Sequence, residues 1–400
     1  MSTTALRLAY VCADRGIAAD GTKGASVHFR EMGRALVEAG FIVDGFVGRA
    51  PAHAPPLSFP VGFPVTALPA PHGASELERE LDTLGSTGAL LDALRSRGPH
   101  DAVYERFSLF NLGGLAYATA SHIPYLVEVN SPLWLEAERY RALELHHAAR
   151  ALAREVFLRA DHVLTVSEEL RKTVIAEGSD PERVRVFPNG VNATLFSTAL
   201  PASRPTVFAG KPVMVFIGSL KPWHGLEFLV AAVLHLAARR PLGVWIVGDG
   251  PLRAKLEDVA RQHPETFVVE GAVAHERVPS ILRAADIAVA PYPASAPTYF
   301  CPLKVVEALA AGCALVAADT PAVRELVGDP PAAELFAPED MESFAAAVDR
   351  VLVDSNRRSW LRERGLARAR PFTWTERAAE VAHLTTASVK RETTGDEVAS

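Results

Sequence analysis

The sequence predicts an α/β protein with two doubly wound, Rossmann-like domains that face each other across a cleft. Short apolar segments alternate with longer amphipathic ones, which is typical of a parallel sheet covered by helices. The alternation pauses near residues 187–191 and restarts after a connector at 201–212 that contains Pro and Ala. We therefore expect a first domain at 1–200 and a second at 201–372, with ligands at the carboxyl ends of the strands.

In the first half, each expected strand is a short apolar run and each expected helix is a longer amphipathic segment. The expected strands are 6–11, 41–47, 123–129 and 162–166. The expected helices are 27–39, 134–158 and 168–176. Residues 51–73 are rich in Pro and Ala and are expected to form a loop excursion with little regular structure.

The second half repeats this organisation. Its expected strands are 213–217, 244–247, 266–269, 287–290 and 314–317. Its expected helices are 226–238 and 252–262, followed by a C-terminal helix at 373–388 that returns to the first domain and a flexible tail at 389–400. Residues 158–166 and 282–289 echo each other, because each combines a helix end, a polar turn and a buried strand. The echo favours two similar lobes over one large sheet.

Composition and charge argue against several classes of protein. With 41 basic and 47 acidic residues the net charge is −6, which favours neither a nucleic acid nor an anionic membrane as a partner. Cys12, Cys301 and Cys313 are too few and too scattered for a disulfide framework or a zinc site, so a reduced, cytoplasmic chain is expected. Neither a signal peptide nor a transmembrane segment is expected, while peripheral membrane contact and the oligomeric state stay open.

The segment from Tyr299 to Gly312 predicts an anion site at the start of a short helix. Pro302 suits the first helical position and Gly312 the residue just past the end. Cys301 is a poor N-cap, so the first helical amides, near Leu303 and Lys304, lack a side-chain acceptor. These amides, the helix dipole and the Lys304 charge together favour a phosphate.

Glu307 lies one turn beyond Lys304 on the same helix face. A carboxylate beside a phosphate site is what a ribose diol needs, so the pair suggests a nucleoside diphosphate. The alternative is an ordinary surface helix with a solvated Lys304–Glu307 pair.

Two more loops in this half follow a predicted strand and contain small residues that let a ligand approach the backbone. The first contains Gly218, Ser219, Lys221, Trp223 and His224, and the second contains Gly248 and Gly250. We expect Lys221 to offer charge to a phosphate. Trp223 is expected to be a packing residue rather than a stacking surface. Three such loops on one rim are more specific than any one of them.

Motifs along nearly the whole chain resemble those of the retaining GT-B glycosyltransferases of family 4. They comprise the Gly24 loop, Ser167-Glu168, Pro188-Asn189-Gly190-Val191, Gly248-Asp249-Gly250-Pro251, Glu307 to Gly312 and Trp374. The resemblance implies transfer of a sugar from a nucleoside-diphosphate sugar to an acceptor hydroxyl, with retention and without a metal. It also implies that the donor phosphate takes the acceptor proton. On the base rates of the family the nucleotide is UDP, which acts as a co-substrate and not as a cofactor.

The resemblance assigns roles to residues of both halves. The donor-binding set is Gly218, Ser219, Lys221, His224, Gly248, Gly250, Val273, Tyr299, Phe300, Cys301, Pro302, Leu303, Lys304 and Glu307. The acceptor-binding set is Asp14, Gly24, Glu105, Arg106 and Asn130. The residues expected to take part in catalysis are Lys221, Lys304 and Asn130.

The chain departs from the family pattern at four positions. Tyr299 replaces a Glu that commonly touches the donor sugar, and Asn130 replaces a His. Ser219 and His224 occupy a loop that usually carries Arg and Lys, so His224 supplies a second charge only if it is protonated. The Tyr-Phe-x-Pro-Leu-Lys form resembles a recurring subgroup of the family.

Other readings stay open at this stage. A nucleotide-sugar epimerase, a pseudo-glycosyltransferase or a non-catalytic nucleotide-sugar binder would use the same fold. A hydride-transferring oxidoreductase is disfavoured, because Asp14-Arg15-Gly16 after the first strand lacks Gly-x-Gly-x-x-Gly spacing. The other histidines, His28, His122, His162 and His275, are expected to be structural or surface residues.

Overall fold

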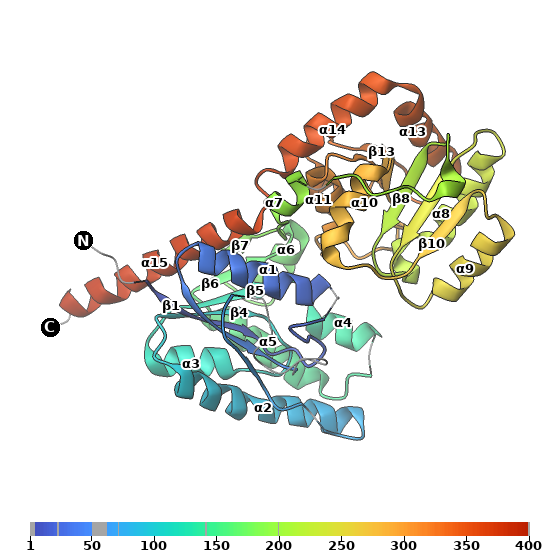
Figure 1. Ribbon diagram of the computed structural model, residues 1–400. Helices are drawn as coiled ribbons and strands as arrows, with labels where there is room; N and C mark the ends of the chain where they lie inside the picture. Colours follow the sequence, from blue (N-terminus) through green and yellow to red (C-terminus); the bar gives the residue numbers. More distant parts are fainter. Residues whose placement is uncertain are drawn as a thin grey trace. The chain divides into compact units, whose positions relative to one another are not determined.

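The structure is a computed structural model that describes residues 5–21, 24–49, 62–70, 72–140, 142–198 and 200–398. These residues form two compact units (Figure 1). The first unit extends to Asn189 and resumes at Trp374, and the second is Gly190–Thr373. Each unit contains one parallel sheet, as the strand–helix alternation predicts.

The first unit has its strands in the order β3-β2-β1-β4-β5-β6-β7. Their bounds are β1 (Arg7–Cys12), β2 (Ile42–Val47), β3 (Val65–Ala67), β4 (Ala102–Arg106), β5 (Tyr125–Val129), β6 (His162–Thr165) and β7 (Val184–Val186). The core on one face is aromatic, because the Tyr10 ring stacks on Phe29 at 4.7 Å and on Tyr104 at 5.2 Å between centroids. Such stacking adds to the burial of the three rings.

Helices cover both faces of this sheet, with α1 and α15 on one side and α2 and α3 on the other (Figure 1). The helices are α1 (Gly24–Glu38), α2 (Glu76–Arg97), α3 (Gly113–Ser121), α4 (Leu133–Tyr140), α5 (His146–Arg159), α6 (Glu168–Ala176) and α15 (Trp374–Val398). Trp374 and Val381 of α15 join the same hydrophobic core as Leu36 of α1. The C-terminal helix is therefore an integral part of the first unit.

The expectation of one helix at 134–158 is wrong, because α4 and α5 are separate. The buried carboxylate of Glu80 on α2 accepts hydrogen bonds from the amides of Glu144 and Leu145, at 3.1 and 2.8 Å, just before α5. These bonds satisfy amides that a continuous helix would pair internally. Helix α15 continues to Val398, so the backbone of 389–398 is helical, and the flexibility expected at 389–400 stays a prediction.

The second unit has the strand order β10-β9-β8-β11-β12-β13. Its strands are β8 (Val213–Ile217), β9 (Gly243–Val247), β10 (Phe267–Glu270), β11 (Ile287–Ala290), β12 (Ala314–Ala318) and β13 (Glu334–Phe336). Its helices are α7 (Ala193–Thr198), α8 (Leu226–Ala237), α9 (Arg253–Gln262), α10 (Val278–Ala284), α11 (Leu303–Ala310), α12 (Pro321–Val327), α13 (Met341–Val353) and α14 (Ser355–Ala369). Short 3₁₀ turns lie at Thr206–Phe208, Pro222–His224 and His275–Arg277.

The unit boundary lies at Asn189 and not at residue 200, before the connector in which the sequence placed it. The reason is that α7 belongs to the second unit. Arg283 of α10 donates a hydrogen bond to the carbonyl oxygen of Phe196 in α7 at 2.9 Å.

Several expected elements coincide with observed ones, and others were missed. Helix α6 and strands β8 and β11 have the expected bounds. Strands β3, β4, β7 and β13 and helices α2, α3, α7, α12, α13 and α14 were not expected. Strand β3 interrupts the loop expected at 51–73, of which residues 51–61 and 71 lie outside the described chain.

Both sheets share the order in which the first strand lies between the second and the fourth. The direction of winding therefore reverses between β1 and β4 in one unit and between β8 and β11 in the other. In open parallel sheets, ligands bind outside the carboxyl ends of the strands at this reversal. The loops after β8 and β11 flank it in the second unit.

The loops that follow β8 and β9 touch through their backbones. The amide of Gly218 donates to the carbonyl oxygen of Val247 at 3.0 Å, and the amide of Leu220 donates to that of Asp249 at 2.8 Å. Gly248 has φ 148°, and a Cβ there would lie 1.9 Å from the carbonyl oxygen of Gly218. Only glycine therefore fits at this position.

The loop after β8 makes the same kind of contact with β11. Gly225 has φ 73°, and a Cβ there would lie 1.6 Å from the carbonyl oxygen of Pro291. The ends of β9, β8 and β11 are therefore held together by backbone contacts, and they form one continuous rim.

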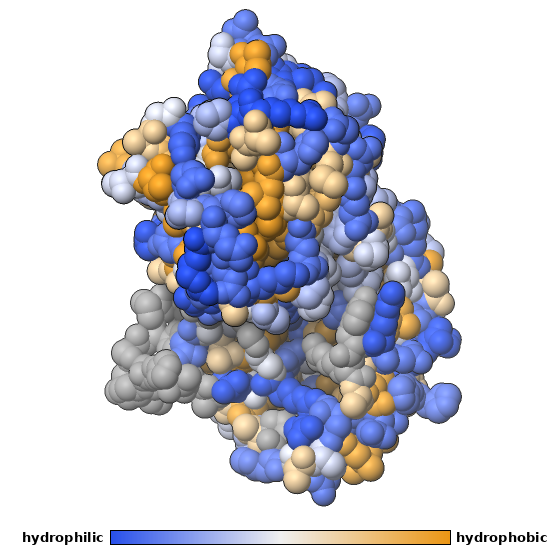
Figure 2. Space-filling model, turned by 90° about the vertical axis from the view of Figure 1, so that its right-hand side faces the viewer, coloured by the Kyte–Doolittle hydropathy of each residue, from blue (hydrophilic) through white to orange (hydrophobic). Residues whose placement is uncertain are grey.

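None of the helices in the described ranges combines the length and the apolar character that crossing a membrane requires. On the face drawn in Figure 2, hydrophilic and hydrophobic residues are interspersed.

We predict that Gly248→Ala lowers stability by about 2 kcal/mol or more, because the added methyl group forces two backbones apart at a strained φ. Gly85→Ala in α2 is the control, since a Cβ there meets no atom within 4 Å. The control should raise stability by about 0.5–1 kcal/mol, as Ala replaces Gly inside a helix. Urea denaturation measures both changes, and an unaltered Gly248→Ala midpoint would contradict the prediction.

Candidate functional site

Helix α11 begins at the rim of the second sheet without a side-chain cap. Pro302 is its N-cap, with ψ 98°, and makes no capping hydrogen bond. The expectation that Pro302 is the first helical residue is therefore wrong by one position, because its extended ψ keeps it outside the helix. Gly312 has φ 64° just past the end, in the left-handed conformation that suits glycine. The first amides of α11 form a partial positive charge at this rim.

Lys304, in the first turn of α11, directs its ammonium group toward the loop after β8. A Cβ placed on Gly218 would lie 3.2 Å from its Nζ. The Nζ lies 4.4 Å from the centroid of the Phe216 ring and 5.0 Å from that of Tyr292. It is buried, and no described residue accepts a hydrogen bond from it. Burial lowers the pKa of Lys304 to about 7, although the Glu307 carboxylate opposes the shift.

Glu307 has a partner that the sequence did not suggest. Nε2 of His275 lies 2.9 Å from Oε1 of Glu307. His275 starts the 3₁₀ turn after β10, and its ring centroid lies 6.1 Å from that of Phe196. The sequence analysis treated His275 as a structural or surface residue, since 32 positions separate it from Glu307. The fold brings the turn after β10 and helix α11 together.

His224 does not supply the expected second charge. Its Nδ1 lies 2.6 Å from the carbonyl oxygen of Ser219, so Nδ1–H donates there. Burial and the positive charges of Lys304 and Lys221 lower the pKa of His224 to about 3. The imidazole is therefore neutral near pH 7, and the condition under which His224 would supply a second charge is not met.

Lys221 and Trp223 lie together on the loop after β8. The Lys221 Nζ lies 4.7 Å from the Trp223 ring centroid, within the range of a cation–π contact. Trp223 is 48% exposed, so the expectation of a packing residue is wrong. The indole instead holds the Lys221 chain at the surface.

Of the remaining predicted donor residues, some are half-buried and others are buried. Val273, in the loop after β10, and Tyr299, before α11, are half-buried. Phe300 packs its ring edge on Tyr292, with centroids 5.1 Å apart. Cys301 is buried.

In the first unit, Glu105, which the sequence analysis assigned to the acceptor-binding set, lies in the core. Its carboxylate is buried and accepts a hydrogen bond from the Tyr125 hydroxyl at 3.0 Å. A Cβ on Gly114 of α3 would lie 2.0 Å from its Oε2. Side chains alternate along β4, and Glu105 points to the face that α3 covers. Burial raises its pKa to about 8, so the group is neutral near pH 7.

Asn130 follows β5 and is tied to a buried carboxylate. Its Nδ2 donates to Oε1 of Glu128 at 2.5 Å, and Nε2 of His28 lies 2.7 Å from the same oxygen. The Tyr104 hydroxyl donates to the other oxygen. Burial alone raises the pKa of Glu128, but His28, Tyr104 and Asn130 outweigh it and lower the pKa to about 2. The amide nitrogen of Asn130 is thus engaged, and its Oδ1 is the atom left to accept a hydrogen bond.

Sequence reasoning missed Glu128 and His28 as members of this cluster. The available signal was a glutamate inside the otherwise apolar strand β5. A charge buried in a strand is costly unless partners satisfy it.

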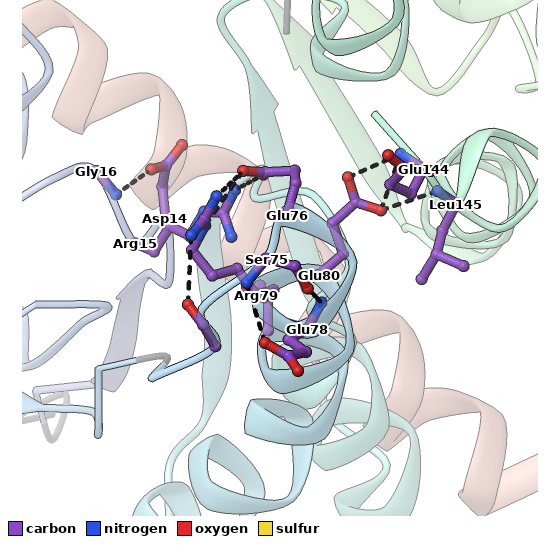
Figure 3. A network of polar contacts seen from close by, with 12 residues as sticks. Asp14, Arg15, Gly16, Ser75, Glu76, Glu78, Arg79, Glu80, Glu144 and Leu145 are labelled. Atoms are coloured by element: carbon purple, nitrogen blue, oxygen red, sulfur yellow. Dashed lines mark hydrogen bonds and ion pairs between the residues drawn. The ribbon is translucent and has the colours of Figure 1, made fainter. Parts of the chain in front are cut away.

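Asp14 closes the turn after β1, since its Oδ1 accepts the Gly16 amide at 2.6 Å (Figure 3). It therefore does not cap a helix. Arg15 beside it forms an ion pair with Glu76 at the start of α2. A small cavity of about 40 Å³ lies here, lined by Asp14, Arg15, Glu76, Glu80, Thr83, Leu109, Phe110, Ala137 and Leu143.

The last two acceptor-side residues lie at a helix start and at a strand end. Gly24 is the first residue of α1. Arg106 ends β4, and its Nε is buried with no hydrogen-bond acceptor among the described residues. In the described ranges no group of three or more His, Cys, Asp or Glu is placed to hold a metal ion.

Two family models match the chain, and each falls on one unit. The model described as "Glycosyl transferase 4-like domain" matches residues 23–190, and the model described as "Glycosyl transferases group 1" matches 211–354.

Proteins of similar sequence are also glycosyltransferases. A D-inositol 3-phosphate glycosyltransferase from Xylanimonas cellulosilytica is 27% identical over 390 residues, which is 92% of each chain. A GDP-mannose-dependent alpha-mannosyltransferase from Mycolicibacterium smegmatis is 28% identical over 71% of this chain and 72% of its own.

Solved structures share the fold. Sucrose-phosphate synthase from Thermosynechococcus elongatus has a TM-score of 0.72 at 19% identity, over 95% of this chain and 98% of its own. Anabaena HepE in complex with UDP and glucose has a TM-score of 0.69 at 17% identity, over 96% and 100%. Because models of the same enzyme group match both units, the chain belongs to the group 1 glycosyltransferases, the family-4 transferases with the GT-B fold.

Proposed function

We propose that this glycosyltransferase moves a sugar from a nucleoside-diphosphate sugar to an acceptor hydroxyl with retention of configuration. The observation that supports the proposal best is the ammonium group of Lys304. It is buried beside an uncapped helix start and has no hydrogen-bond acceptor among the described residues. Burying an unpaired cation is costly, and a bound diphosphate would remove the cost.

The chemistry follows from where charge develops. The bond between the sugar C1 and the diphosphate oxygen breaks, and negative charge grows on the leaving group. Lys304 and the α11 amides stabilise that charge, and Lys221 adds a second cation at the rim. The acceptor oxygen forms the new bond to C1, and its proton passes to the departing diphosphate, as the family resemblance implies. Glu307 accepts hydrogen bonds from the ribose hydroxyls.

On the acceptor side we assign Asn130, Asp14, Gly24 and Arg106, and we leave out Glu105 because it is buried in the core. Asn130 takes part through Oδ1, since its amide nitrogen is bound to Glu128. It therefore accepts a hydrogen bond from a sugar hydroxyl and neither gives nor takes a proton.

The nucleotide base is open between two candidates. The HepE structure is a complex with UDP and glucose, whereas the mannosyltransferase from Mycolicibacterium smegmatis is GDP-mannose-dependent. UDP remains our first choice and GDP the second. No cofactor is proposed, and a cytoplasmic location remains our expectation.

Tyr299 supports a second candidate, in which the donor binds but the reaction differs. A phenol cannot hold the negative charge of the family's glutamate near pH 7. An epimerase, a pseudo-glycosyltransferase or a non-catalytic binder would tolerate that change.

Release of nucleoside diphosphate from UDP- and GDP-hexoses, with and without candidate acceptors, tests the proposal. Acceptor-dependent release and a product with the donor's anomeric configuration by NMR are expected. Saturable binding without release would favour the binder, and an inverted product would contradict retention.

Nucleotide binding should take up a proton at Lys304. The pKa of about 7 in the free protein rises when a diphosphate binds, because the anion favours the charged amine. Affinity should therefore fall as the pH rises above about 7, by up to about tenfold per pH unit. Calorimetry in buffers of different ionisation enthalpy measures the uptake.

Lys304→Met should abolish that uptake and weaken binding. Lys255→Met on α9 is the control, because Lys255 is an exposed partner of Glu227 away from α11. Equal proton uptake by the Lys304 variant and the native protein would contradict the assignment.

Tyr299→Glu should change the preference among donor sugars more than the affinity for the nucleoside diphosphate. Tyr299→Phe, which keeps the ring, separates the hydroxyl from the bulk of the side chain. Identical donor ratios for the three proteins in a panel of UDP- and GDP-hexoses would count against a sugar-facing role.

A further inference from the structure

We propose that His275 is a positioning residue that orients the Glu307 carboxylate for the ribose diol of the nucleotide. The inference rests on the proposed donor function. It adds a residue that neither the sequence motifs nor the comparisons point to. The carrying observation is the 2.9 Å contact between His275 Nε2 and Glu307 Oε1.

The contact joins two elements that are distant in the chain. His275 begins the turn after β10, at the edge of the sheet, and Glu307 lies in the second turn of α11. Their side chains are only 18% and 13% exposed. A largely buried pair is less screened by solvent than a surface pair, so its geometry is better defined.

One oxygen of the carboxylate is thereby fixed and the other remains available. A carboxylate offers about four acceptor positions, of which His275 occupies one on Oε1. Oε2 and the second lone pair of Oε1 are enough to accept two vicinal hydroxyls. Ordering this side chain before the ligand arrives removes part of the conformational cost of binding.

The same contact has a competing explanation. His275 would instead fill the place of a ribose hydroxyl and leave when the nucleotide binds. Under that explanation, removing the imidazole would leave nucleotide affinity unchanged or raise it. Positioning predicts a loss, so the two explanations differ in sign.

Three substitutions at His275 separate the effect of side-chain length from that of the N–H donor. Gln can place an amide N–H near the position of Nε2, whereas Asn carries the same group on a shorter chain. His275→Ala and His275→Asn should weaken UDP or GDP binding roughly tenfold, the scale of a hydrogen bond to a charged group. His275→Gln should recover most of the affinity. Calorimetry on the full chain measures all four proteins.

Ligands without a ribose diol test whether the loss of affinity in the His275 variants comes from contacts with the ribose. The 2′,3′-dideoxy form of the nucleotide that binds, and inorganic diphosphate, should bind the native protein and His275→Ala within about twofold, because neither offers a diol to Glu307. In a Glu307→Ala background, removing His275 should have no further effect. With a donor sugar, KM should rise while kcat changes little.

His235→Ala is the matched control. Its Nε2 lies 3.2 Å from Oε1 of Glu342, so it also removes a histidine–glutamate contact of the second unit, at the end of α8. This variant should bind nucleotide as the native protein does.

The outcomes distinguish the two proposals. If the native protein binds no UDP, GDP or ADP, the donor function fails and the inference fails with it. If the native protein binds a nucleotide and His275→Ala binds it equally well or more tightly, only the positioning role is overturned. An equal loss for the ribo and dideoxy forms would show a structural role and would also overturn it.

Discussion

Close backbone contact among the loops after β8, β9 and β11 is the constraint on which the rest of the second unit depends. Gly218, Gly225 and Gly248 allow these loops to touch without intervening side chains. Lys304 can then lie against Gly218, and its ammonium group is shielded by the rings of Phe216 and Tyr292. The rim therefore offers backbone atoms and one buried cation, which suits a compact anion better than an extended apolar ligand.

The sequence predicts this part of the fold well because the signals are local. Strands β8 and β11 are apolar runs that end at Gly218 and Pro291, so their bounds follow from composition. Strand β4 carries Glu105 and Arg106 and does not look buried, yet Glu105 is accommodated by protonation at a raised pKa. The break between α4 and α5 depends on Glu80 of α2, more than 60 positions away. No periodicity near residue 141 encodes it.

The candidate site likewise combines features with a local sequence signal and features that depend on contacts between distant residues. Lys304 and Glu307 share a helix face, so their spacing alone indicates that they act together. The partnership of Glu307 with His275 arises only when the turn after β10 meets α11 in space. The neutral state of His224 is a property of its surroundings, since two lysines and burial act on it together. A residue type gives the possible charge of a side chain, and the packed structure selects the actual one.

Glu105 and Glu128 show this selection most clearly. They lie on neighbouring strands, both buried, yet the pKa of one is raised to about 8 and that of the other is lowered to about 2. Glu105 has one hydroxyl partner, whereas Glu128 has His28, Tyr104 and Asn130 around it.

The ionised Glu128 fixes the amide of Asn130 with its nitrogen inward. An amide carries no proton to exchange near neutral pH, so position 130 contributes orientation and no acid–base chemistry. If the departing diphosphate accepts the proton of the attacking hydroxyl, the transfer needs no acid or base at position 130. The replacement of histidine by asparagine is thus compatible with that mechanism, provided that Lys304 holds the charge on the leaving group.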